Sequence, residues 1–78
     1  MNKLNFLDKL ADVLVILEDE TIENCDLDFK NGNISITLDD TVDEKQLQDE
    51  FIDCESVKNV VVRNEKESCS IFIIFRGI

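Results

Sequence analysis

The strongest constraint on the fold lies between residues 25 and 38, where apolar and polar side chains alternate on both sides of Asn31-Gly32. An Asn-Gly pair favours a two-residue type I′ turn, because both turn positions need a positive φ. Such a turn would pair Phe29 with Ile34 and place the apolar side chains of both strands on one face. The segment therefore predicts a β-hairpin with one apolar and one polar face.

A second hairpin is predicted near the C-terminus, with strands at residues 57–63 and 68–75 and a turn at residues 64–67. We expect Arg63 to pair with Ser68, which directs one set of alternating apolar side chains to the core. The other face also carries apolar side chains, namely Val57, Val61, Phe72 and Ile74. This hairpin is therefore expected to be apolar on both faces, unlike the first.

Two amphipathic helices are also predicted. Apolar residues recur at spacings of three and four over about residues 4 to 18, with Asn2 or Asn5 as the N-cap. A second helix is expected to begin at Thr41, which would form a capping box with Glu44, and to end near residue 54. Its apolar stripe consists of Leu47, Phe51 and Cys54. Its other side gathers the carboxylates of Asp43, Asp49, Glu50 and Asp53.

The predicted elements follow the order α-β-β-α-β-β, which defines an α+β fold. We expect a four-stranded antiparallel sheet with two helices packed on one face. The 78 residues are enough for a single domain, residues 1–78, with a thin core. The apolar set of the second hairpin would then lie on the outer face of the sheet, where it could contact a partner or a second copy.

Charge is distributed very unevenly along the chain. Residues 18 to 55 contain fourteen acidic residues and two lysines, a net charge of −12, whereas the remaining residues sum to +2. A chain with this charge is repelled by phosphate, so we expect no direct nucleic-acid binding and no binding to anionic membranes. No apolar run is long enough to span a bilayer, and charges interrupt the N-terminal segment. We expect a cytoplasmic protein, in the host cytoplasm if it is viral.

The residue types give little support for catalysis or for a cofactor. The chain has no histidine, no tyrosine and no Gly-rich phosphate loop, so we expect neither enzyme activity nor a cofactor. The three cysteines, Cys25, Cys54 and Cys69, are widely spaced, and we interpret them as reduced, small hydrophobic residues. No metal is expected, although a loose Ca²⁺ or Mg²⁺ site among Asp39, Asp40 and Asp43 stays open.

Two surfaces are candidates for function. The first is acidic and consists of Glu18, Asp19, Glu20, Asp39, Asp40, Asp43, Asp49, Glu50, Asp53 and Glu55. The second is the apolar set of Val57, Val61, Phe72 and Ile74. The acidic residues could imitate the phosphates of a duplex and occupy the binding groove of a basic protein. The same charge could instead serve only to keep the chain in solution.

In size, charge and predicted architecture the chain resembles small acidic inhibitors of phages and mobile elements, although no motif identifies one family. Examples are DNA-mimic anti-restriction and anti-CRISPR proteins, and the immunity proteins that neutralise basic nuclease toxins. This resemblance implies a non-enzymatic inhibitor that occludes a basic nuclease or nucleic-acid-binding protein. The alternative is a small acidic dimeric binding module, similar to a secretion chaperone, which would use the apolar sheet face and form a homodimer.

Overall fold

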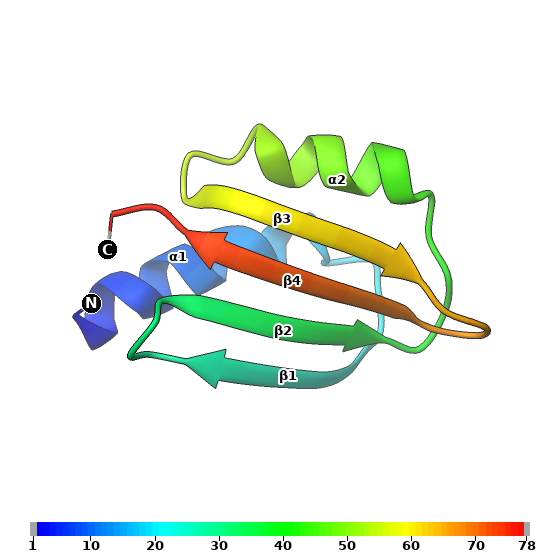
Figure 1. Ribbon diagram of the computed structural model, residues 1–78, viewed down its shortest axis with the longest axis horizontal. Helices are drawn as coiled ribbons and strands as arrows, with labels where there is room; N and C mark the ends of the chain where they lie inside the picture. Colours follow the sequence, from blue (N-terminus) through cyan, green and yellow to red (C-terminus); the bar gives the residue numbers. More distant parts are fainter. Residues whose placement is uncertain (1, 78) are drawn as a thin grey trace.

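The computed structural model describes residues 2–77 and has the predicted order of elements (Figure 1). The elements are α1 (Lys3–Ile16), β1 (Ile22–Asp28), β2 (Asn33–Leu38), α2 (Glu44–Ile52), β3 (Val57–Asn64) and β4 (Cys69–Phe75). The strands form one antiparallel sheet in the order β1-β2-β4-β3, so β2 and β4 are central and β1 and β3 are the edges. The predicted α+β class and four-stranded antiparallel sheet are thus confirmed.

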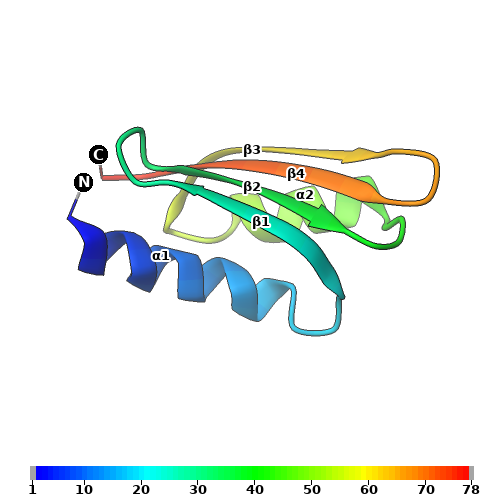
Figure 2. The same ribbon diagram turned by 90° about the horizontal axis from the view of Figure 1, so that it is seen from below.

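One hydrophobic core contains buried side chains from the sheet and from both helices. Figure 2 shows α1 as a layer beneath the sheet, while α2 runs along β3 (Figure 1). Phe6 of α1 is fully buried, with its ring centroid 4.5 Å from that of Phe29 and 5.2 Å from that of Phe75. The strands contribute the buried side chains Ile34, Ile36, Leu38, Val57, Val60, Val62, Cys69, Ile71, Ile73 and Phe75, and the helical regions contribute Phe6, Val13, Leu17, Leu47 and Phe51.

The first hairpin has the predicted faces but a different turn. Leu27 pairs with Ile34, so the strands are shifted by two residues from the predicted pairing, and residues 29–32 form the loop. Only Gly32 in this loop has a positive φ, of 69°, and its N–H donates to the carbonyl of Asp28 at 2.9 Å. A type I′ turn needs two positive φ angles and is therefore absent. A shift of two residues leaves every side chain on its original face.

The second hairpin shows the same kind of shift and one change of face. Arg63 pairs with Ser70 instead of Ser68, and the faces of Val60 and Val62 stay as predicted. The pairing is irregular between Val57 and Asn59, however. A bulge adds one residue to one strand and so reverses the alternation beyond it. Val57 consequently lies in the core, only 2% exposed, and its predicted place on the outer face was wrong.

The helix ends are also set by local hydrogen bonds. Asn2, one of the two predicted N-caps of α1, accepts a hydrogen bond from the N–H of Leu4 at 2.7 Å. The predicted capping box at Thr41 is wrong: Asp43 caps α2 by accepting from the N–H of Gln46 at 3.2 Å. Helix α2 therefore begins at Glu44 and has only nine residues.

Candidate functional site

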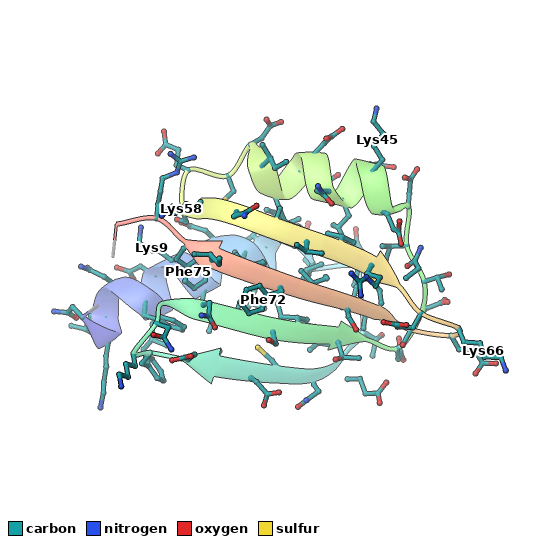
Figure 3. All side chains as sticks on the ribbon, viewed as in Figure 1. Lys9, Lys45, Lys58, Lys66, Phe72 and Phe75 are labelled. Carbon is teal, nitrogen blue, oxygen red and sulfur yellow. The ribbon has the colours of Figure 1, made fainter. Side chains whose placement is uncertain are left out.

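The ten acidic residues predicted to bind a partner are all exposed. They come from four parts of the chain: the turn after α1, the connection from β2 to α2, α2 itself and the turn that follows it. The labelled lysines Lys45, Lys58 and Lys66 project outward from the edges and ends of the molecule (Figure 3). The acidic residues therefore form a broad surface around α2, rather than one compact cluster.

A groove between the end of α1 and the beginning of α2 brings two of the acidic segments together. It has a volume of about 460 Å³. Its lining consists of Ile16, Glu18, Asp19, Glu20, Val42, Asp43, Gln46, Leu47 and Glu50. One wall thus carries three consecutive acidic residues after α1, and the other carries Asp43 and Glu50 of the α2 region. More than twenty residues separate these walls in the sequence, so only the tertiary fold places them side by side.

The other predicted acidic residues lie outside this groove. Asp49 and Asp53 line a shallower depression of about 370 Å³ on the exposed side of α2, which also includes Asp43 and Glu50. Asp39, Asp40 and Glu55 line neither of these two hollows. Among the predicted acidic residues, Asp43 and Glu50 are therefore the two that connect the groove with the outer surface of α2.

The floor of the groove is apolar. Ile16 and Val42 are half-buried and Leu47 is almost fully buried. An apolar floor between carboxylate walls suits a side chain with a hydrocarbon stem and a cationic end, because lysine and arginine bury their stems while keeping their charge solvated or paired. Five carboxylates line this one groove, and like charges repel one another. The charge and the lining of the groove therefore suit basic side chains better than anions.

Asn64, which the sequence placed only in a turn, positions one wall of the groove. Its side chain accepts from the N–H of Val42 at 2.9 Å and donates to the carbonyl of Val42 at 2.7 Å. Its backbone N–H donates to Glu44 at 2.6 Å. These three bonds fasten the segment before α2 to the end of β3. No sequence pattern indicates such a contact, because the two partners are more than twenty residues apart.

A second unpredicted contact ties α1 to the segment between α2 and β3. The hydroxyl of Ser56 donates to a carboxylate oxygen of Asp12 at 2.6 Å, and Ser56 is only 8% exposed. The backbone nearby is held by Arg76, whose N–H donates to the carbonyl of Ser56 at 2.8 Å. The relative position of the two helices thus depends on polar contacts as well as on the core.

The second predicted surface is smaller than expected. Val61 and Phe72 are 48% and 40% exposed on the outer face of the sheet, and Ile74 is half-buried there. Phe72 lies over the central strands, on the side that faces the viewer in Figure 3. A shallow hollow of about 480 Å³ on this face includes Val61 and Phe72. Within the sheet, Phe72 pairs with Ser35 of β2 on one side and with Val61 of β3 on the other. The other side chains that line the hollow are mostly polar. Three apolar side chains therefore remain on this face.

The three cysteines are free. Burial raises the pKa of Cys69, and burial together with the nearby carboxylate of Asp26 raises the pKa of Cys25. A raised pKa keeps a thiol protonated at neutral pH and hence poorly reactive. Both thiols therefore act as apolar groups at neutral pH.

The carboxylates between β2 and α2 take part in local hydrogen bonds. Asp40 accepts from the N–H of Thr41 at 2.8 Å, and Asp43 caps α2. Within residues 2–77, no group of three or more acidic or cysteine side chains is arranged to hold a metal ion. Asp39, Asp40 and Asp43 therefore do not form the loose cation site that the sequence left open.

Comparison with protein-family models, curated proteins and solved structures gave no match. In the described part of the chain, neither helix is long and apolar enough to cross a membrane.

Proposed function

We propose that this protein is a non-enzymatic inhibitor that binds a basic protein, such as a nuclease or a DNA-binding factor, through its acidic surface. The observation that carries this proposal is the groove whose two walls, Glu18 to Glu20 and Asp43 with Glu50, are both anionic. Folding alone gives no reason to line one groove with five carboxylates, since their mutual repulsion lowers stability. A partner that inserts lysine or arginine side chains would relieve that repulsion.

Inhibition would follow from occupation of the partner's nucleic-acid-binding surface. The acidic surface extends from the groove along the exposed side of α2 through Asp49 and Asp53. Opposite charges on the partner would accelerate association over long range, and the bound domain would then exclude nucleic acid sterically. No bond is made or broken in this mechanism.

The test begins with capture of partners from host lysate at low and at high salt, with identification by mass spectrometry. The affinity of the recovered protein is then measured for the wild type and for the double variant Glu20→Lys/Glu50→Lys. Glu23→Lys/Glu67→Lys is a matched control, because it changes the net charge equally at exposed positions outside the groove. We expect the groove variant to lose about tenfold or more in affinity at low salt, and the control to lose much less.

The recovered protein must also lose its nuclease or DNA-binding activity when the wild-type inhibitor is added. Equal affinities for the groove variant and the control would contradict a role for the groove. Binding that stays constant as the salt concentration rises would contradict an electrostatic interface altogether.

A second candidate is an acidic dimeric binding module, similar to a secretion chaperone. It is favoured by Val61 and Phe72, which are exposed and pair with each other on the outer face of the sheet. Its test uses Phe72→Glu and Ile74→Glu. If this face binds the partner, these substitutions should abolish binding without unfolding the domain, and the salt concentration should have little effect. Unchanged binding by both variants would rule out this function.

A further inference from the structure

Helix α1 has two apolar faces, and only one of them packs against the sheet. Phe6, Val13 and Leu17 are buried in the core. Leu4, Leu7, Leu14 and Val15 are exposed by 72%, 46%, 37% and 66%, respectively. Figure 2 shows α1 as the outermost layer on its side of the sheet. The second face of α1 is therefore left uncovered by the described part of the chain.

The exposed face has the spacing of a helix-pairing seam. Leu4, Leu7, Ala11 and Leu14 follow one another at intervals of three, four and three residues, which matches the a and d positions of a heptad. Together with Val15 they occupy an arc of roughly 100°. This arc is centred roughly 130° around the helix from the buried face. We call these five residues, Leu4, Leu7, Ala11, Leu14 and Val15, the α1 seam.

We propose that the α1 seam binds the α1 seam of a second copy of this chain, with the two helices antiparallel. In this arrangement a positions face d positions, so Leu4 lies opposite Leu14 and Leu7 opposite Ala11. The same contacts then occur twice, as an isologous two-fold interface requires. The small Ala11 leaves space for the Leu7 side chain of the other copy, and this pairing of large with small residues allows close packing.

The charges at the two ends of α1 favour the antiparallel orientation. Glu18, Asp19 and Glu20 follow the C-terminal end of α1, where carboxylates oppose the negative end of the helix dipole. In an antiparallel pair these residues lie beside the N-terminal end of the other helix, which has positive partial charge and carries Lys3. A parallel pair would instead bring the two acidic ends together. The acidic ends thus become favourable only in the antiparallel pair.

The charge distribution also explains why the second copy should use α1 rather than another surface. Residues 1–17 have no net charge, whereas residues 18–55 carry −12. A dimer formed through α2 or the groove would bring two strongly acidic surfaces together. A dimer through α1 keeps the two α2 surfaces apart, and the acidic side of α2 remains free for a different partner.

The interface is small, since each copy contributes one helix of 14 residues. Interfaces at the low end of the size range are weak, and we expect a dissociation constant on the order of micromolar or higher. Each copy carries a net charge of −10, so salt should strengthen the dimer by screening the repulsion. Salt should have the opposite effect on binding of a basic partner, which separates this interaction from the proposed inhibitor function.

The test is sedimentation equilibrium of the full chain from micromolar to millimolar concentration at low and high salt. Leu7→Glu should weaken self-association by about tenfold or more, because a charge would be buried in the seam. Phe72→Glu is the matched control on the opposite face and should associate like the wild type. A wild type that stays monomeric throughout would overturn the proposal, and so would a Phe72→Glu variant that alone loses the dimer.

Charge reversal tests the orientation of the two helices. Lys3→Glu should weaken the dimer several-fold at low salt, because it places a carboxylate beside the acidic end of the other copy. Lys3→Glu combined with Glu18→Lys should restore the affinity in an antiparallel pair. If the double variant associates no better than Lys3→Glu alone, the antiparallel orientation is wrong. Circular dichroism of each variant verifies that the helices are intact.

Discussion

The two helices contribute to the same core but differ in what they expose. Helix α1 has 14 residues and leaves four large apolar side chains exposed. Helix α2 has nine residues and exposes one large apolar side chain, Ile52, beside three carboxylates, Lys45 and Gln46. Folding needs only one apolar stripe from each helix. Phe6 and Val13 supply that stripe in α1, and Leu47 and Phe51 supply it in α2.

The remaining exposed residues of each helix therefore point to contacts beyond the fold. On α1 the exposed residues that the core does not need include four large apolar side chains, which suit a second helix of the same kind. On α2 the excess is anionic, which suits a basic partner. A single small domain could thus use α1 for self-association and the exposed side of α2 for recognition.

The largest effect on stability should come from the buried stripe of α1. Phe6→Ala removes a fully buried ring that contacts Phe29 and Phe75, and it should lower the free energy of unfolding by about 3–5 kcal/mol. Leu4→Ala is the matched control from the exposed face, and it should change this free energy by less than about 0.5 kcal/mol when the chain is monomeric. Urea unfolding followed by circular dichroism measures both. Similar losses for the two variants would contradict the assignment of buried and exposed faces.

The attachment of α2 should depend on one polar side chain. Asn64→Ala removes both side-chain hydrogen bonds to Val42, and it should lower the free energy of unfolding by about 1–3 kcal/mol. Asn59→Ala is the control on the same strand, because Asn59 is exposed and its side chain bonds only to the next residue, Val60. Hydrogen exchange at residues 44–47 should accelerate in Asn64→Ala but not in Asn59→Ala. Unchanged exchange in both variants would show that the side chain of Asn64 does not hold the beginning of α2.

These contacts also show which part of the structure could be predicted from the sequence. Alternation of apolar residues determines which face a side chain occupies, and a shift of two residues in either hairpin does not alter it. The faces of Leu27, Ile34 and Val62 were therefore predicted correctly although both pairings were wrong. Val57 was misplaced because a bulge has no distinct signal in an apolar strand.

The candidate site was predictable only in its composition. The number and exposure of the carboxylates follow from the sequence, because charged residues are costly to bury. The groove does not follow from it, since its walls come from segments that the tertiary fold brings together. The α1 seam was missed because a helix with two apolar faces gives one broad periodic pattern, which was interpreted as one amphipathic helix.

The acidic excess of α2 should carry a measurable cost in stability. Asp53 is the C-cap of α2, where a negative charge opposes the helix dipole. Asp53→Asn should raise the free energy of unfolding by about 0.3–1 kcal/mol at low salt, and high salt should reduce the gain. Asp8→Asn, in the interior of α1, which has no net charge, should give a smaller gain. A loss of stability in Asp53→Asn would mean that the carboxylate has a structural role in the fold.

The smallest expected effect on stability concerns Asp28, an acidic residue of the first hairpin that takes part in local hydrogen bonds. Asp28 accepts from the side chain of Asn31 at 2.9 Å and from its backbone N–H at 3.0 Å. These bonds favour the carboxylate and lower the pKa of Asp28 below its ordinary value of 3.8. Because the folded pKa is the lower one, this stabilisation is present above pH 3.8 and is lost as the pH falls through the folded value.

Asn31→Ala should therefore lower the melting temperature slightly at neutral pH, because it removes the side-chain bond to Asp28. The difference from the wild type should shrink as the pH falls below 3.8, since a protonated Asp28 gains little from that bond in either protein. Thermal unfolding at a series of pH values measures this directly. A difference that persists unchanged in acid would mean that Asn31 acts through the conformation of the loop and not through the charge of Asp28. In that case the hairpin would not depend on the charge of Asp28 for its stability.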